Sequence, residues 1–443
     1  MGQPAVQPPR RAGRFALVAL ALVVAACGGG PEEEILPGTR ISVMDFDRAL
    51  QPNASISDVR VSLPRPAVNE AWPGTNGFPS HVQGHLALGD SLRPAWRTSV
   101  GSGAGSRENL VSPPTVAQGL AFAMDADGRV SAVDLESGQQ RWRRDLAPDH
   151  EREGLWGGGI AWQDGRLYVA TGFAQVIALD AVTGSELWRR RLSGPMRSGP
   201  TVVGNRLFVL TIDNRLTALA TDDGSELWTH AAIEETAAIL GGASPAVASG
   251  VVVAAFSSGE IFALREENGR PLWSDTLAAL RRIDAVSSLA DIRGAPVIAG
   301  DQVIAASHSG RMVAIDLPTG RRIWELPAGG INMPWVAGDY VFTVTSDGQV
   351  LAIQRQTGQV RWTTALARFT DADEDQRIAW YGPVLAGDRL ILAGSHGVAL
   401  ALSPYTGALL GSLDLGGPLS VPPVVARGQV LFLTNAAQLL AYR

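Results

Sequence analysis

The chain has 443 residues, of which 46% are hydrophobic and 18% are charged, and its formal net charge is −6. The hydrophobic content excludes a disordered chain, and the 50 glycines and 27 prolines disfavour a helical bundle. The negative charge provides no basic surface for a phosphate backbone, so we expect no nucleic-acid partner. The length fits two or three average domains or one large repeat architecture.

A short apolar segment near the N-terminus predicts export from the cytoplasm. Arg10, Arg11 and Arg14 precede an unbroken apolar run over residues 15–26, which is too short to span a bilayer and is typical of a signal peptide. Cys27 follows directly. The sequence Val-Ala-Ala-Cys resembles a bacterial lipobox, in which the cysteine is acylated, commonly with palmitate, and becomes the mature N-terminus.

Cys27 is the only cysteine, so the chain has no pair for a disulfide and no set for a multi-cysteine zinc site. We therefore predict a lipoprotein signal peptide over residues 1–26 and a lipid anchor at Cys27. Gly28, in place of aspartate, resembles the default sorting signal for the outer membrane, so we expect the chain on its periplasmic face. An ordinary signal peptide cut near a chance cysteine is the alternative.

Residues 27–92 are rich in glycine, proline, asparagine and glutamate. This composition predicts a lipidated tether followed by an irregular N-terminal segment. From residue 93 to residue 443 the chain instead repeats a turn glycine followed four residues later by tryptophan. The six pairs are Gly138 and Trp142, Gly184 and Trp188, Gly224 and Trp228, Gly269 and Trp273, Gly320 and Trp324, and Gly358 and Trp362. A seventh turn, at Gly407, has Gly411 where tryptophan is expected.

Alternating apolar runs separated by glycine turns lie between these marks, which predicts antiparallel strands. Each unit has four strands and about 38 to 51 residues, judged from the spacing of successive tryptophan positions, and this is the signature of a β-propeller. Three-strand units begin near eight positions: Pro114, Gly159, Pro200, Pro245, Pro296, Pro334, Pro383 and Pro423. The sequence therefore predicts an all-β, eight-bladed propeller of four-stranded antiparallel blades over residues 93–443.

The two ends of this region predict how the ring closes. The last unit stops at Arg443 without an outer strand, whereas residues 94–98 precede the first unit and have no inner strands of their own. We predict that this N-terminal strand completes the last blade, which removes free sheet edges.

The tryptophans are predicted to pack between neighbouring blades rather than to bind a ligand, because each buried aromatic side chain removes roughly 150 to 250 Å² from water. The structural repeat residues are Trp96, Trp142, Trp188, Trp228, Trp273, Trp324 and Trp362.

The unit from Gly128 to Trp142 resembles the tryptophan-docking repeats of the pyrroloquinoline-quinone propeller superfamily. With the lipobox and the eight units added, the chain resembles the BamB-type lipoproteins of the outer-membrane β-barrel assembly machinery. The resemblance covers residues 93–443, and the stretch 330–340 is typical of that family. The resemblance implies a non-catalytic scaffold without a cofactor or metal. It implies docking to the periplasmic domains of the central barrel-inserting subunit, alongside other accessory lipoproteins and unfolded outer-membrane protein precursors.

In that family, partner contacts come from two neighbouring loops on one rim, whose counterparts here are residues 237–242 and 288–293. The resemblance places Ile239 at an apolar contact position and Asp291 at an acidic one, with Leu240, Gly241 and Arg293 beside them. Leu240 stands where better-known members have arginine, and Arg293 stands where they have a second aspartate, so the charge pattern is altered. Alternatively, both loops are only well-packed turns.

A periplasmic quinoprotein dehydrogenase is the alternative function. Asp371, Asp373 and Asp375 alternate as at the start of a calcium loop, but the glycine and the bidentate glutamate of such a loop are missing. His81 and His85 have a helical spacing but lie among glycines and prolines, so we predict no metal site there. A third possibility is a propeller that binds another ligand, such as peptidoglycan, or a sensor partner.

Overall fold

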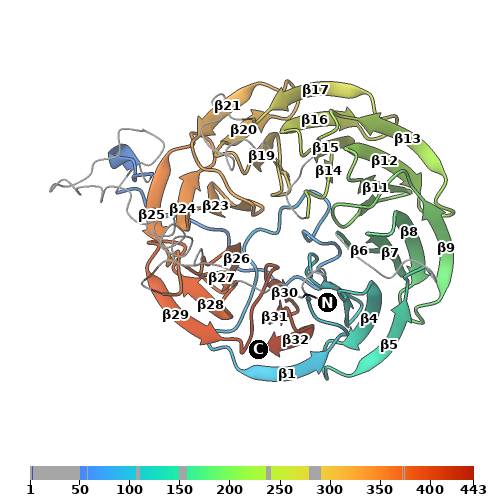
Figure 1. Cartoon of the computed structure of the whole chain (residues 1–443). Helices are drawn as coiled ribbons and strands as arrows, with labels where there is room; N and C mark the ends of the chain where they lie inside the picture. The colour runs from blue at the N-terminus through green and yellow to red at the C-terminus, as the bar shows by residue number, and fades with distance from the viewer. Residues whose placement is uncertain are drawn as a thin grey trace. The chain divides into compact units, whose positions relative to one another are not determined.

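Eight four-stranded antiparallel sheets surround a central axis as the blades of a β-propeller (Figure 1). The structure is a computed structural model that describes residue 2 and residues 50–56, 58–105, 110–148, 157–235, 241–278, 291–371, 373 and 375–443. The blades belong to one unit, residues 49–443. The predicted all-β, eight-bladed fold is confirmed.

Blades 1 to 4 each consist of four consecutive strands. Blade 1 contains β2 (Thr115–Ala117), β3 (Leu120–Met124), β4 (Arg129–Asp134) and β5 (Gln140–Asp145). Blade 2 contains β6 (Gly158–Gln163), β7 (Arg166–Thr171), β8 (Gln175–Asp180) and β9 (Glu186–Arg191). Blade 3 contains β10 (Thr201–Val203), β11 (Arg206–Leu210), β12 (Arg215–Ala220) and β13 (Glu226–Ala231). Blade 4 contains β14 (Ala246–Ala248), β15 (Val251–Ala255), β16 (Glu260–Arg265) and β17 (Pro271–Thr276).

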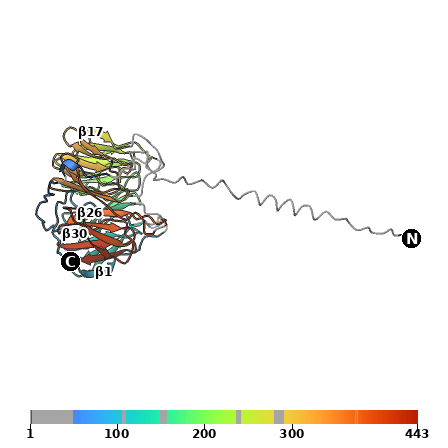
Figure 2. The ribbon, with the colours of Figure 1, turned by 90° about the vertical axis from the view of Figure 1, so that its left-hand side faces the viewer.

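Blades 5 to 7 follow the same plan, and blade 8 combines the two ends of the propeller region. Blade 5 contains β18 (Val297–Ala299), β19 (Gln302–Ala306), β20 (Met312–Asp316) and β21 (Arg322–Leu326). Blade 6 contains β22 (Trp335–Ala337), β23 (Tyr340–Val344), β24 (Gln349–Gln354) and β25 (Val360–Ala365). Blade 7 contains β26 (Trp380–Ala386), β27 (Arg389–Gly394), β28 (Val398–Leu402) and β29 (Leu409–Asp414). Blade 8 contains β30 (Val424–Ala426), β31 (Gln429–Leu433), β32 (Gln438–Tyr442) and β1 (Pro94–Ser99). A short 3-10 helix, η2 (Ala54–Ile56), precedes β1. Figure 2 shows the ring from the side, with β17 and β1 at opposite edges.

Burial decreases from the inner strand of a blade to its outer strand. In blade 1, all three residues of β2 are buried, whereas Trp142 is the only buried residue of β5. A strand covered on both faces requires a continuous apolar run, and a strand with one covered face needs only alternate apolar residues. This difference explains why the outer strands are marked in the sequence by a single large aromatic residue.

The ring closes through β1, which pairs antiparallel with β32. Trp96 lies opposite Ala441, just as Trp142 lies opposite Ala132 in blade 1, and both strand pairs have a bulge next to the tryptophan. Arg93 N–H donates to the Arg443 carbonyl at 2.7 Å, and Arg443 N–H donates back at 3.0 Å. The predicted closure by the N-terminal strand is therefore confirmed.

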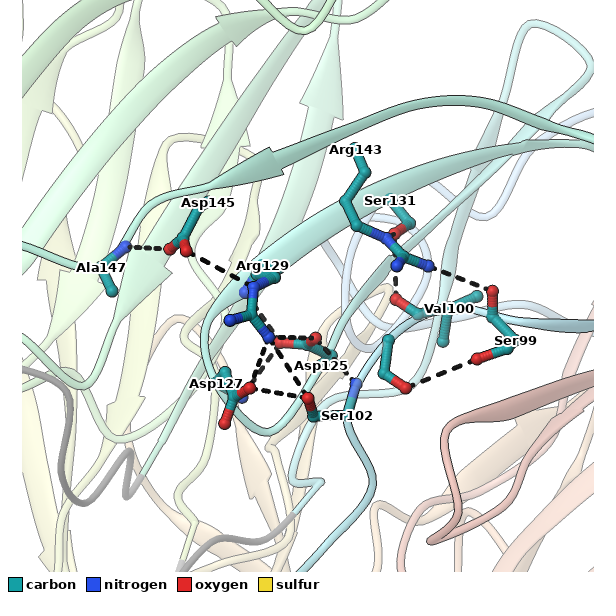
Figure 3. A network of polar contacts seen from close by, with 11 residues as sticks. Ser99, Val100, Ser102, Asp125, Asp127, Arg129, Ser131, Arg143, Asp145 and Ala147 are labelled. Carbon is teal, nitrogen blue, oxygen red and sulfur yellow. Dashed lines mark hydrogen bonds and ion pairs between the residues drawn. The ribbon is translucent and has the colours of Figure 1, made fainter.

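Polar contacts attach the chain just after β1 to blade 1 (Figure 3). The backbone N–H of Ser102 donates to the Asp125 carboxylate at 2.9 Å, and its hydroxyl donates to Asp127 at 2.6 Å. The Arg143 guanidinium donates to the Ser99 carbonyl at 3.3 Å. The closing strand is thus hydrogen-bonded to blade 8 along β32 and held to blade 1 by these side chains.

Seven tryptophans dock onto the blade that follows their own. Trp142 Nε1 donates to the Ala181 carbonyl at 3.1 Å, and a Cβ placed on Gly184 would lie 2.7 Å from Trp142 Cδ2. The other indoles donate to carbonyls at the equivalent turn: Trp96 to Leu135, Trp188 to Thr221, Trp228 to Glu266, Trp273 to Leu317, Trp324 to Arg355, and Trp362 to Pro404. Each turn glycine therefore receives the preceding blade's tryptophan, while the tryptophan four residues later docks onto the next blade.

The junction between blades 7 and 8 has no such indole. Gly411 lies opposite Ala401, the register position that tryptophan occupies elsewhere. Blade 8 takes its outer strand from β1, so no glycine turn joins its third and fourth strands. A cavity of about 230 Å³ lined by Leu92, Leu410 and Phe432 lies at this junction. The missing tryptophan in the seventh repeat thus coincides with the missing turn that would receive it.

Residues 67–88 run along the inner strands of the blades, near the centre of the ring, and are seen as the blue segment there in Figure 1. We call this segment the collar. Trp72 exchanges two backbone hydrogen bonds with Val116 of β2, at 2.7 and 2.8 Å. Other backbone bonds join Pro73 to Trp162, Pro79 to Val247, Ser80 to Ile298, Leu86 to Leu385, and Asn69 to Arg427. The collar therefore pairs backbone groups on inner strands that would otherwise present a free sheet edge.

Candidate functional site

The two loops expected to contact a partner converge on the buried side chain of Arg197. The described part of the first loop, from residue 241, leads into β14, and the described part of the second, from residue 291, leads into β18 of the neighbouring blade. Arg197 Nη2 donates to Asp291 Oδ2 at 2.7 Å and to the Gly241 carbonyl at 3.2 Å. The exposed fractions of the Arg197 and Asp291 side chains are only 4% and 1%. The ion pair joins Asp291 to the segment that enters β10, and the hydrogen bond joins Gly241 to the same segment, so three consecutive blades are connected at one rim.

The structure brings together three of the five residues named for the partner interface. Gly241, Asp291 and Arg293 all lie around Arg197, whereas Ile239 and Leu240 fall outside the described residues. Asp291 is buried in the ion pair, so its carboxylate orients the rim rather than standing free on the surface. The sequence pattern gave no signal for Arg197, because this residue lies 94 positions away from Asp291.

Arg293 lies beside the ion pair, and no hydrogen bond or ion pair joins it to another residue of the described part of the chain. Burial lowers the pKa of its guanidinium, an effect opposed by nearby Tyr381 and Asp291. Burial also raises the pKa of the Tyr381 hydroxyl, and Arg293 opposes that shift. Gly241 has a φ of +86°, and a Cβ there would lie 3.2 Å from Arg293 Nε, so both the turn and the close approach favour glycine.

A central cavity of about 90 Å³ lies against this cluster. Its wall includes Arg197, Ser198, Arg293 and Tyr381 from the blades, together with Trp72 from the collar. Two guanidinium groups thus lie in the wall of the cavity, and among the described residues no aspartate or glutamate lines it. The cavity is electropositive on the side where the two loops meet.

The same rim carries two exposed isoleucines that the sequence analysis did not single out. Ile212, in the β11–β12 turn, is 48% exposed, and Ile233, just after β13, is 62% exposed. The segments that carry them are joined, since the side chain of Asn214, two residues after Ile212, donates to the Ile233 carbonyl at 2.6 Å. An alignment of the repeats shows that Ile212 is unusual. In the turns between the second and third strands of blades 4 and 6, the same position is occupied by Ser257 and Ser346.

The candidate metal ligands are engaged in structural contacts. His81 Nδ1 lies 2.7 Å from the Pro296 carbonyl, and His85 Nδ1 lies 2.8 Å from the Pro64 carbonyl, which fixes both rings within the collar. Asp371 accepts the backbone N–H of Asp375 at 3.1 Å. Within the described ranges, no group of three or more histidine, cysteine, aspartate or glutamate side chains is arranged to hold a metal ion.

The proposed anchor, Cys27, lies outside the described residues. In the part of the chain that the structure describes, no helix has the length and apolar character needed to cross a bilayer.

Comparison with known proteins identifies the family. A family model described as outer membrane protein assembly factor BamB matches residues 90–153 and 126–364. The chain belongs to the BamB family. BamB from Yersinia pestis is 29% identical to it over 242 residues, which make up 54% of this chain and 61% of that protein. The aligned region therefore spans about three-fifths of this relative's length.

Solved structures extend the likeness in fold. BamB from Moraxella catarrhalis superimposes with a TM-score of 0.68 and 20% identity, covering 80% of this chain and 100% of that one. A europium-containing methanol dehydrogenase gives a TM-score of 0.66 at 14% identity, covering 82% of this chain and 90% of that one. An assembly factor and an enzyme thus share this fold, so the fold alone does not decide the function.

Proposed function

We propose that this BamB-family chain is a non-catalytic scaffold subunit of the machinery that assembles β-barrel proteins in the outer membrane. In this proposal, the Cys27 lipid holds it at the periplasmic face of that membrane. Its rim docks to the periplasmic domains of the central barrel-inserting subunit, near other accessory lipoproteins and unfolded precursors. Family membership supports the role in assembly.

The geometry of the rim supports docking there. The loops on blades 4 and 5 are fixed to blade 3 through Arg197, and exposed Ile212 and Ile233 lie on the same rim. A rigid ring that presents apolar side chains on adjacent loops suits a protein partner, because little conformational entropy is lost on binding. We propose that Ile239 and Leu240 add to this apolar surface, while Gly241 and Asp291 set the loop geometry and Arg293 supplies positive charge.

Co-purification tests this proposal. After gentle detergent extraction, the wild-type chain is expected to carry the barrel-inserting subunit with it. The double substitution Ile239→Glu and Leu240→Glu is expected to abolish this, because charges introduced into an apolar contact oppose desolvation. Val182→Glu is the matched control: Val182 is 65% exposed and lies in the β8–β9 turn, at the opposite ends of the strands. Equal recovery of the subunit with all three chains would contradict docking at this rim.

Membrane attachment is tested separately. Cys27→Ser is expected to abolish incorporation of radiolabelled palmitate, because it removes the acylated thiol. A Cys27→Ser chain that still incorporates the label would exclude Cys27 as the site of lipid attachment.

A periplasmic quinoprotein dehydrogenase is the second candidate, favoured by the fold shared with methanol dehydrogenase. Incubation with calcium and pyrroloquinoline quinone, followed by a dye-reduction assay with alcohol substrates, separates the two functions. The scaffold proposal predicts no dye reduction above that of heat-denatured protein.

A further inference from the structure

The central cavity has a surplus of positive charge that nothing in the described structure neutralises. Arg197 and Arg293 both line it, whereas the one carboxylate beside them, Asp291, is already paired with Arg197. Arg293 is partly buried, and a cation withdrawn from water without a counter-ion is costly. A ligand that brings negative charge into this space would offset that cost.

Hydrogen-bond donors without a partner in the same cavity wall also indicate a negatively charged ligand. Arg197 Nη1 and Ser198 Oγ are buried polar atoms that have no hydrogen-bond partner among the described residues. Arg197 itself is 4% exposed. Buried donors are almost always satisfied in folded proteins, so donors left open beside a cavity indicate that a ligand or water completes them. Tyr381 lines the same cavity and lies close enough to Arg293 to interact with it electrostatically.

We propose that the central cavity binds one small oxyanionic group, a carboxylate or a phosphate, between Arg293, Arg197 Nη1 and the Ser198 hydroxyl. Planar guanidinium groups match these anions because they donate two parallel hydrogen bonds. A volume of about 90 Å³ is large enough to hold one such group. The site shares Arg293 with the proposed partner surface, but binding of a small anion needs only the isolated chain and is measured without the partner.

The negative group has two chemical sources: a free small anion, or the acidic side chain of a polypeptide segment that enters the cavity from the rim. Four probes distinguish them: acetate, inorganic phosphate, the blocked tripeptide acetyl-Gly-Glu-Gly-amide, and its glutamine counterpart. Binding is followed on the full purified chain through the melting temperature, which rises when a ligand binds only the folded state. Chloride is exchanged for each charged probe at constant ionic strength, because screening alone changes stability.

We expect a saturable rise in melting temperature with at least one of acetate, phosphate and the glutamate peptide. Arg293→Gln is expected to weaken that binding at least tenfold, and Ser198→Ala provides a second, smaller change in the same direction. The matched control is Arg265→Gln, because Arg265 is an exposed residue at the end of β16. It is expected to bind as the wild type does.

The probes that bind identify the source of the negative group. Binding of acetate or phosphate without the glutamate peptide assigns the site to free anions, whereas binding of the glutamate peptide but not the glutamine peptide assigns it to an acidic side chain. The proposal is overturned if none of the three charged probes gives a saturable shift, or if the glutamine peptide binds as well as the glutamate peptide. It is also overturned if both Arg293→Gln and Ser198→Ala retain wild-type affinity. Co-purification with the barrel-inserting subunit is not used as a readout, so failure here leaves the scaffold proposal standing.

Discussion

The indole of Trp142 lies against Gly184 of the next blade, where a Cβ would approach Cδ2 to 2.7 Å. The same contact recurs at seven of the eight junctions and is accompanied each time by an indole N–H hydrogen bond to a backbone carbonyl. Neighbouring blades are therefore coupled by one aromatic side chain and one glycine. These couplings join consecutive blades at the side of the ring opposite the rim around Arg197.

Trp228→Ala tests the energy of one coupling. Trp228 is 9% exposed, so its removal is expected to lower the free energy of unfolding by about 3 to 5 kcal/mol. Leu227→Ala on the same strand is the control, because Leu227 is 44% exposed and its loss is expected to cost no more than about 0.5 kcal/mol. Urea denaturation measures both values. Similar losses for the two variants would show that the indole is not a junction anchor.

Replacement of glycine by alanine is expected to have opposite effects on stability at Gly269 and at Gly411. At Gly269, φ is +69° and a Cβ would lie 2.5 Å from Trp228 Cε3, so Gly269→Ala is expected to destabilise by about 1 to 3 kcal/mol. At Gly411, no atom lies within 4 Å of the added Cβ. Gly411→Ala is therefore expected to stabilise by about 0.5 to 1 kcal/mol, because glycine is unfavourable within a strand. Denaturation midpoints that shift in the same direction would contradict the junction geometry.

Asp291→Asn is predicted to be strongly destabilising because it leaves Arg197 as an uncompensated buried charge. The expected loss is about 3 to 5 kcal/mol in the free energy of unfolding. Adding Arg197→Met to Asp291→Asn is expected to recover part of that loss, since the charge is then gone. Denaturation of the single and double variants measures the difference. If the double variant is less stable than Asp291→Asn, the buried ion pair does not account for the effect.

The collar predicts a pH dependence through His81. Burial lowers the pKa of His81 to about 4 from 6.5, and its Nδ1 lies 2.7 Å from the Pro296 carbonyl. Between these two pKa values the unfolded chain binds a proton that the folded chain does not. Stability is therefore expected to fall as the pH drops from 6.5 towards 4, by about 3 kcal/mol in total for this group.

His81→Asn tests this contribution, because asparagine tolerates the φ of 65° at this position and retains a side-chain N–H donor. Unfolding free energies at pH 7 and pH 4.5 are compared for the wild type and the variant. The variant is expected to lose less stability on acidification. Equal losses in the two proteins would show that His81 titrates normally in the folded state.

The fold was predictable because its signals are local and repeated. Period-2 apolar runs, turn glycines and the tryptophan spacing indicated eight blades, and the missing last strand indicated how β1 closes the ring. The collar was not predictable, because residues 67–88 have no periodicity and their hydrogen bonds are made to strands distant in sequence.

The site was only partly predictable. The family resemblance indicated which loops to inspect, but the partner of Asp291 is Arg197, from another blade, and only the folded ring brings these side chains together. The burial of Asp291 likewise follows from packing among three blades and not from any local pattern.

Site-specific photocrosslinking tests the scaffold account most directly. A photoreactive phenylalanine analogue is placed singly at Ile212, Ile233 or Val182, all of which are exposed. The account predicts crosslinks from positions 212 and 233 to the barrel-inserting subunit and none from position 182. Crosslinks to that subunit from position 182, with none from the other two, would contradict docking through the rim that Arg197 organises.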